Sequence, residues 1–128
     1  MKIKARKERI HNVLRKIAEV KGIVFLVIID REGFSLSSVI SEGYGDRVDI
    51  SALSPLVSSL LKQIESVSGE IEMEEAREVT IEYKNGILKL NQIPDRNEYL
   101  VTLADASSNL SLLRMETKKN IKTLAKEL

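Results

Sequence analysis

The residues that could carry chemistry are sparse in this chain of 128 residues. There is no cysteine, which excludes disulfides, thiolate metal sites and cysteine nucleophiles. His11 is the single histidine, and one imidazole cannot supply the several converging ligands that a metal site needs. No serine lies in the Gly-x-Ser-x-Gly turn that exposes a hydrolase nucleophile. We therefore expect no catalytic residue, no metal site and no enzymatic activity.

Gly43-Tyr44-Gly45 is the segment most similar to a phosphate-binding loop. A dinucleotide fingerprint requires Gly-x-Gly-x-x-Gly, and Val48 stands at the place of the third glycine. The Gly-x-x-x-x-Gly-Lys-Ser/Thr pattern of triphosphate binding occurs nowhere in the sequence. We expect the chain to bind no cofactor and no nucleoside triphosphate.

Two runs of like charge each have a chemical and a simpler interpretation. The acidic run 70–75 could pair carboxylates or hold a divalent cation, but the alternating Ile71 and Met73 favour a strand entry with solvated outer positions. The basic start of the chain could contact lipid or nucleic acid through Lys2, Lys4, Arg6, Lys7 and Arg9. Because aromatic residues are few and the formal net charge is only +1, a solvated helix start is favoured. We expect no nucleic-acid partner.

The composition is that of one globular domain. Hydrophobic residues make up 43% and charged residues 30%, and no repeat or Pro/Gly-rich linker divides the chain, so residues 1–128 should form a single unit. The longest apolar run, 23–29, is far shorter than the roughly 20 residues that span a bilayer. No apolar stretch of a signal peptide follows the basic start. We expect a cytoplasmic protein without integral membrane contact.

The first predicted element is an amphipathic helix. Its apolar residues at helical spacing are Ile10, Val13, Leu14 and Ile17. The seven apolar residues 23–29 do not alternate with polar ones, so this strand should be covered on both faces. After a turn at 30–33, residues 34–40 predict a second strand, whose serines suit a sheet edge.

A second helix is predicted up to about residue 67, and its start has two interpretations. Pro55 lacks the backbone donor of a regular helix interior. Either Ser54 caps a helix that starts at Pro55, or a helix that starts near Asp49 is kinked there. Ile50 continues the apolar stripe, which favours the earlier start.

Asn85-Gly86 is the clearest turn signal, because this pair is preferred in type I′ hairpin turns. A two-residue loop at these positions predicts that Tyr83 faces Leu88 and that Ile81 faces Leu90. A further turn at 94–97, a strand at 99–104 and a last helix from about residue 107 complete the chain. The short connections between strands predict an antiparallel sheet, with elements in the order α-β-β-α-β-β-β-α.

Five segments occur in an order and spacing typical of a known family. They are Val20-Lys21-Gly22, Ile28 to Phe34, Val79 to Gly86, Tyr99 to Ala104 and Leu110 to Arg114. Together they resemble the Roadblock/dynein light chain domain family. The resemblance implies an α+β fold, in which a five-stranded antiparallel sheet has one helix on one face and two on the other. It also implies that two copies join through the second helix and the third strand.

The function implied by the resemblance is non-enzymatic. Family members serve as motor light chains, as scaffolds for small GTPases and, in prokaryotes, as regulators of Ras-like GTPases. This short chain is more similar to the free-standing prokaryotic members. We expect a homodimeric adaptor or regulator whose partner is a small GTPase. The alternatives are a small-ligand sensory domain, which would need a pocket lined by aromatic or polar residues, and a generic dimerisation scaffold.

Arg114 matches an arginine of the family pattern at the start of the last helix. An arginine can stabilise the charge of a transferring phosphoryl group. A structural pair with an acidic neighbour is the better interpretation for this residue.

The expected pairing surface combines a strand edge with spare apolar positions on the second helix. In the topology that the resemblance implies, the outer side of the strand that carries Val79, Ile81 and Tyr83 has no partner within the chain. Three charged residues could block it: Glu78, Glu82 and Lys84. The helix has more apolar residues than one face can bury.

Two divisions of these helix residues remain open. In the first, Leu53, Val57, Leu60 and Ile64 face the sheet, and Leu56 and Leu61 face the partner; the opposite division is nearly as well supported. The candidate dimer interface is therefore Leu56, Leu60, Leu61, Ile64, Val79, Ile81 and Tyr83.

Overall fold

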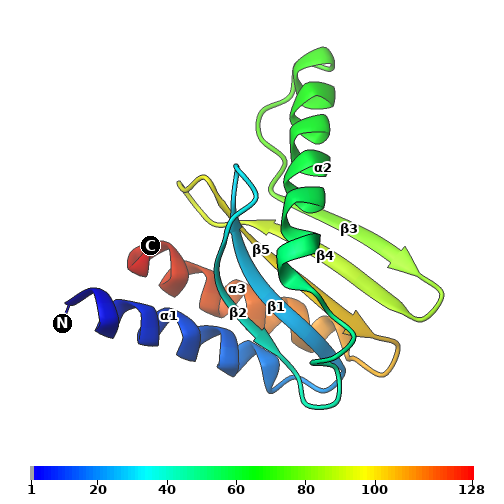
Figure 1. Cartoon of the computed structure of the whole chain (residues 1–128). Coiled ribbons are helices and arrows are strands. Elements are labelled where there is room, and N and C mark those ends of the chain that lie inside the picture. Colours follow the sequence, from blue (N-terminus) through cyan, green and yellow to red (C-terminus); the bar gives the residue numbers. More distant parts are fainter. Residues whose placement is uncertain (1) are drawn as a thin grey trace.

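A five-stranded antiparallel sheet has two helices on one face and a single helix across the other (Figure 1). The computed structural model describes residues 2–128, and Lys2 only through its backbone. The elements are α1 (Lys2–Ala18), β1 (Ile23–Asp30), β2 (Ser35–Ile40), α2 (Ile50–Glu70), β3 (Glu78–Tyr83), β4 (Gly86–Gln92), β5 (Glu98–Asp105) and α3 (Leu110–Glu127). The strands lie in the order β2-β1-β5-β4-β3. The predicted element order and antiparallel sheet are confirmed.

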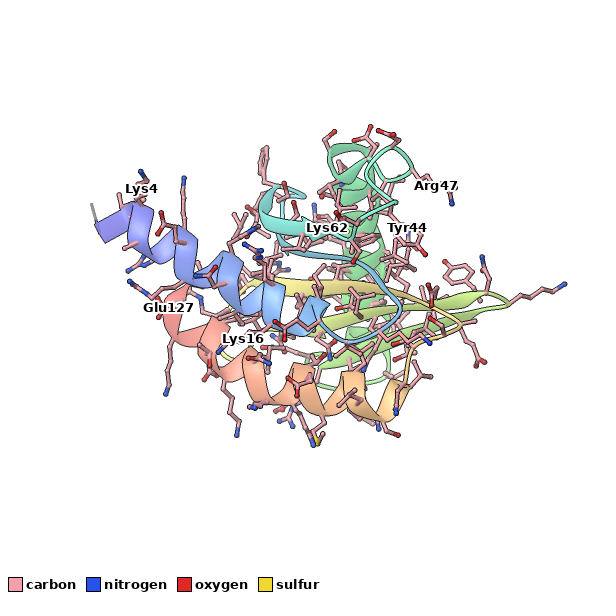
Figure 2. The ribbon with its side chains drawn as sticks, turned by 90° about the horizontal axis from the view of Figure 1, so that it is seen from below. Lys4, Lys16, Tyr44, Arg47, Lys62 and Glu127 are labelled. Carbon is pink, nitrogen blue, oxygen red and sulfur yellow. The ribbon has the colours of Figure 1, made fainter. Side chains whose placement is uncertain are left out.

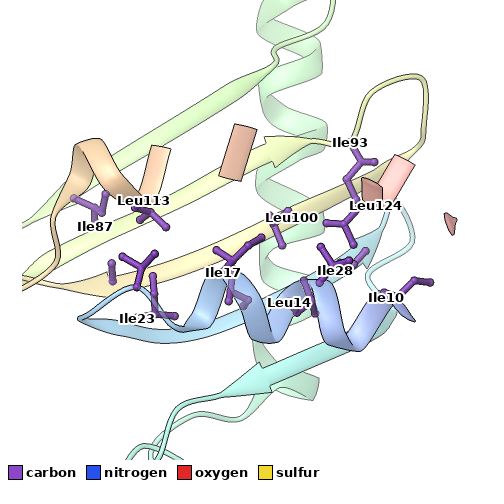
Figure 3. Packing of buried hydrophobic residues seen from close by; sticks show 14 residues of the cluster. Ile10, Leu14, Ile17, Ile23, Ile28, Ile87, Ile93, Leu100, Leu113 and Leu124 are labelled. Atoms are coloured by element: carbon purple, nitrogen blue, oxygen red, sulfur yellow. The ribbon is translucent and has the colours of Figure 1, made fainter. Parts of the chain in front are cut away.

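The sheet face under α1 and α3 carries the larger core. β1 lies between β2 and β5 and is buried on both faces, as its unbroken apolar sequence predicts. Figure 3 shows Leu14 and Ile17 of α1 packed with Leu113 and Leu124 of α3 against Ile28 and its neighbours. All five side chains are fully buried. The predicted amphipathic stripe of the first helix is thus the stripe that forms this core.

α1 and α3 lie side by side and run in opposite directions. Arg9 Nε donates a hydrogen bond to Glu127 Oε2 at 2.9 Å, which joins the start of α1 to the end of α3. At the other end, the Asp105 N–H donates to the carbonyl of Gly22 at 2.7 Å. Gly22 has φ +89°, and a Cβ there would lie 2.7 Å from the backbone nitrogen of Ser108. Only glycine allows this close approach.

α2 starts at the earlier of the two positions considered. The Asp49 side chain caps it by accepting a hydrogen bond from the Ala52 N–H, and the Ser51 hydroxyl also donates to Asp49 at 2.7 Å. These donors lower the pKa of Asp49. Pro55 lies inside the helix, so the alternative that Ser54 caps a later helix is wrong. The Ser54 hydroxyl instead donates to the Ile50 carbonyl at 2.7 Å.

The β3–β4 hairpin exists where predicted, but its turn and register differ from the prediction. The loop residues are Lys84 and Asn85, and Tyr83 pairs with Gly86, Ile81 with Leu88. Gly86 does not have a positive φ. A Cβ on Gly86 would lie 2.3 Å from the Ala104 carbonyl oxygen of β5. The glycine therefore serves close strand approach and not a type I′ turn. Since the pairing shifts by two residues, the predicted faces are preserved.

Candidate protein-protein interface

α2 covers only part of its face of the sheet. It packs across β1 and β2, and its carboxyl-terminal half extends beyond the sheet in Figure 1. The side chains of α2 that are buried all lie in its first twelve residues: Ser54, Val57, Ser58 and Leu61. The Ser58 hydroxyl donates to the Arg31 carbonyl in the β1–β2 turn, and Arg31 Nη2 contacts Glu65 Oε2 at 2.5 Å. On this face α2 reaches only the nearer part of β4 and β3: Leu90 of β4 is buried in the core below α2, and Leu88 and Val79 lie at the margin of that core.

A second apolar stripe runs along α2 outside the buried one. Leu56 is 69% exposed and Val67 is 57% exposed, while Leu60 and Ile64 are half-buried. These four residues follow one another at intervals of three or four, so they share one side of the helix. Exposed apolar side chains in a continuous stripe are typical of an interaction surface.

The orientation of this helix corrects part of the expected interface. The first of the two divisions puts Leu61 on the partner side, but Leu61 is only 6% exposed and packs in the core below α2. Val57 is buried against the sheet, as expected. Leu53 and Leu60 pack at the margin of the same core. Because Leu61 lies one turn beyond Val57, it follows the buried stripe; spacing alone could not tell which of two apolar stripes meets the sheet.

β3 is an edge strand with a free outer side. Within residues 2–128 it pairs with β4 only, and its side chains alternate between the two faces of the sheet. Val79 and Ile81 are half-buried and Tyr83 is 51% exposed. Val79 packs at the margin of the core that includes Val57 and Leu61 of α2, so these three β3 residues face the α2 side. The structure therefore brings the expected β3 residues and the outer α2 stripe to one face.

Glu78 does not block this edge, because its carboxylate turns inward over β4. Lys89 Nζ lies 2.8 Å from Glu78 Oε1, and Arg114 Nη2 of α3 lies 3.6 Å from Glu78 Oε2. The hydrogen bond from Lys89 lowers the pKa of Glu78, and the positive charge of Arg114 adds to this effect. The expected acidic partner of Arg114 is thus Glu78, at the start of the edge strand.

Lys89 is the residue of this cluster that sequence reasoning missed. Its side chain is only 6% exposed, which is unusual for lysine. It occupies an apparent outer position of an alternating strand, yet α3 covers that face. Only the packing of α3 reveals that the position is buried.

A cleft of about 650 Å³ opens at the end of the sheet on the α2 side. It is bordered by Tyr44, Arg47, Tyr83 and Asp105, among others. Asp105 accepts hydrogen bonds from Ser107 and, at 3.2 Å, from the Tyr44 hydroxyl; the Ser107 bonds lower the pKa of Asp105 most. Its carboxylate is therefore engaged in the turn before α3 and is not free to orient a ligand.

The other candidate sites also lack the geometry of a chemical centre. Within residues 2–128, no three His, Asp or Glu side chains converge as a metal site requires. His11 is exposed on α1. The acidic run 70–75 leaves the end of α2 as an exposed connection, and β3 starts only at Glu78. The run is solvated as expected, but the expected strand entry is wrong. No helix in the described part of the chain is long and apolar enough to cross a membrane.

Comparisons with known proteins agree with this fold. A family model described as the Roadblock/LC7 domain matches residues 9–104. The gliding protein MglB from Thermus thermophilus is 20% identical, with a TM-score of 0.87 over 96% of this chain and 90% of that one. MglB from Myxococcus xanthus is also 20% identical, with a TM-score of 0.85 over 94% and 87%. An MglB structure with a tetrameric arrangement matches at 20% identity and TM-score 0.88 over 96% and 90%. No curated protein sequence matches the chain.

Proposed function

This chain belongs to the Roadblock/LC7 domain family, and we propose that it acts as a homodimeric adaptor that regulates a Ras-like small GTPase. Family members are generally non-catalytic regulators. The single observation that carries the proposal is the incompletely covered sheet face, where the outer stripe of α2 and the free edge of β3 lie together. A second copy of the chain can satisfy both features at once.

The proposed dimer pairs β3 with β3 of the second copy in antiparallel register. Such pairing satisfies the free N–H and C=O groups of the edge and creates a two-fold axis perpendicular to the sheet. The same residues then contribute from both copies: Leu56, Leu60, Ile64, Val79, Ile81 and Tyr83. Burial of apolar area at this surface supplies roughly 25 cal/mol per Å² before the cost of association is subtracted.

Leu56→Asp tests the dimer, because it places a charge in the exposed stripe without touching the core below α2. We expect sedimentation equilibrium to show twice the chain mass for the wild type and a single chain mass for the variant. Ile3→Asp is the matched control, since Ile3 is 72% exposed on α1, away from the surface. Equal masses for wild type and Leu56→Asp, at concentrations where the wild type is dimeric, would refute this interface.

The GTPase partner needs a separate test. Tagged wild-type protein is used to capture partners from its source lysate, with GDP and with a slowly hydrolysed GTP analogue in parallel. We expect a small GTPase to be recovered in one nucleotide state, and purified components then show whether hydrolysis is accelerated or slowed. Recovery of the chain alone from both samples would leave the dimer intact and remove the support for GTPase regulation.

The similar fold of MglB, including its tetrameric arrangement, supports self-association as the starting point. The sensory alternative has less support, because the cleft at the α2 side is open and its Asp105 is engaged in a turn. A thermal-shift screen distinguishes the two: a large, saturable shift with a metabolite would favour the sensor.

A further inference from the structure

The net charge of +1 is the sum of a strongly basic pair of helices, α1 and α3, and an acidic remainder of the chain. α1 and α3 together carry twelve Lys and Arg residues and three Asp and Glu residues, a net charge of +9. The rest of the chain carries eight basic and sixteen acidic residues, a net charge of −8. Since the two helices come from opposite ends of the sequence, only the fold joins them into one basic layer.

The basic layer forms one outer face of the molecule. α1 and α3 pack together on the sheet face opposite α2, and Figure 2 shows nitrogen-tipped side chains projecting outward from both helices. Among the described side chains, two arginines of these helices are engaged, Arg9 with Glu127 and Arg114 with Glu78. The remaining cations are exposed and form no ion pair with other described residues: Lys4, Arg6, Lys7, Arg15, Lys16, Lys118, Lys119, Lys122 and Lys126.

Apolar side chains project from the same layer. On α3, Met115 is 59% exposed, and Lys119, Lys122 and Lys126 follow it at intervals of four, three and four residues, which places all four on the solvent side of the helix. Leu112 precedes them and is also exposed. The solvent side of α3 therefore carries both apolar and cationic side chains.

The mixture fits an anionic lipid surface better than a nucleic acid. Eight of the twelve cations are lysines, which act as point charges and lack the planar fork with which arginine contacts a guanine in two places. None of the five aromatic residues lies on α1 or α3, so the layer offers no stacking platform for bases. Exposed Met and Leu beside lysines match the boundary between lipid headgroups and acyl chains.

We propose that the outer face of α1 and α3 docks the protein on bilayers that contain anionic lipid. The lysines approach the headgroups, and Met115 and Leu112 insert at the acyl boundary. The proposal does not rest on the GTPase function, because this face lies on the opposite side of the sheet from α2 and the candidate dimer surface. In the proposed dimer, the two-fold axis perpendicular to the sheet would place both basic layers on the same side and so strengthen the attachment.

The test is co-sedimentation of the full chain with vesicles of phosphatidylcholine and phosphatidylserine in a ratio of about 70:30. We expect binding to these vesicles at about 0.1 M NaCl, none to vesicles of phosphatidylcholine alone, and release at about 1 M NaCl, where screening shortens the Debye length to about 3 Å. The variant Lys119→Glu/Lys122→Glu/Lys126→Glu should weaken the partition coefficient at least about 100-fold. Met115→Ser should weaken it several-fold without changing the salt dependence.

The matched control is Lys21→Glu/Arg47→Glu/Lys84→Glu, which changes the net charge equally outside the basic layer. We expect it to retain most of the wild-type partition coefficient, and sedimentation confirms that each variant keeps the wild-type mass. The proposal is overturned if the wild type does not co-sediment with anionic vesicles, or if both triple variants lose binding equally. Duplex DNA and a poly-glutamate peptide serve as competitors, and tight binding to either without vesicle binding would reassign the layer to that partner.

Discussion

The two faces of the sheet differ in how far the chain itself covers them. Under α1 and α3, the core side chains are buried, and Leu14 and Leu124 have no exposed area. The two helices lie across the strands, and a hydrogen bond joins the start of α1 to the end of α3. On the other face, α2 packs over β1 and β2 and covers Leu90 of β4, while the outer part of β3 remains open beside the exposed Leu56 and Tyr83. The first face is complete within one chain, and the second is suited to a partner.

This difference assigns separate roles to residues of the same chemical type. A leucine in the closed core contributes to the stability of the single chain, because its removal leaves a cavity that cannot collapse fully. A leucine on the outer stripe of α2 contributes little to the stability of the single chain, and under the proposed function it would contribute to the stability of the dimer. Substitutions on the two faces should therefore change different measurable quantities.

Leu14→Ala should produce the largest effect on folding. Leu14 is fully buried between α1, α3 and the sheet, so we expect the free energy of unfolding to fall by about 2–5 kcal/mol. Urea denaturation at a fixed protein concentration measures this loss. Leu56→Ala, measured in a chain kept monomeric by dilution, should change it by less than about 0.5 kcal/mol. Similar losses for both variants would remove the distinction between the faces.

Gly86→Ala should cause the next largest loss in the free energy of unfolding, because it disturbs the packing of β4 against β5 in the hairpin that carries the open edge. The added Cβ would meet the Ala104 carbonyl, and the resulting shift of β4 should cost about 1–3 kcal/mol. Gly45→Ala is the control, since Gly45 has no neighbour within 4 Å of an added Cβ and no positive φ. We expect Gly45→Ala to be neutral or slightly stabilising. Both changes are measured by thermal unfolding.

The sequence predicted the elements well because their signals are local. The unbroken apolar run in β1, the stripe of α1 and the favoured start of α2 near Asp49 each depend on a few neighbouring residues, and the structure has them where expected. The Asn85-Gly86 pair predicts a positive φ at the glycine, but Gly86 is needed for its close approach to Ala104, eighteen residues away. A contact between two strands cannot be predicted from the residues next to the glycine in the sequence.

The candidate surfaces were harder to predict for the same reason. Two apolar stripes on α2 have the same spacing, and only packing against β1 shows that Leu61 belongs to the buried one. The alternation of the β4 sequence predicts that Lys89 is solvated, but in the fold its side chain is only 6% exposed because α3 covers that face. The net charge of +1 argues against a basic surface, but it says nothing of position: α1 packs beside α3 in the fold, so Lys4 and Lys7 belong to the same basic layer as the lysines of α3.

Glu78→Gln should have a smaller effect, and one that depends on pH. The pKa of Glu78 is lowered in the folded state, chiefly by the hydrogen bond from Lys89, so the carboxylate stabilises the fold above its ordinary pKa of 4.5. That stability is lost as the pH falls through the lower, folded-state pKa. Because the carboxylate is about one third exposed, we expect wild type to exceed the variant by only about 1 kcal/mol at pH 7.

The measurement is the free energy of unfolding by urea from about pH 7 to about pH 3. The difference between wild type and Glu78→Gln should shrink below pH 4.5. Glu82→Gln is the control, because Glu82 lies on the same strand but forms none of the ion pairs found among the described residues. A difference that stays constant down to the lowest pH would contradict the depressed pKa.

The smallest effect concerns the attachment of α2 itself. Arg31 in the β1–β2 turn contacts Glu65 on α2, and both side chains are more than 40% exposed, so a double-mutant cycle with Arg31→Ala and Glu65→Ala should give a coupling of about 0.2–1 kcal/mol. The coupling should decrease further in about 1 M NaCl. A coupling this small would mean that the packing of Val57 and Leu61 holds α2 on the sheet. The position of the outer stripe would then not depend on salt. A coupling above about 2 kcal/mol would instead make the exposed ion pair the main attachment, and the open face would then change with ionic strength.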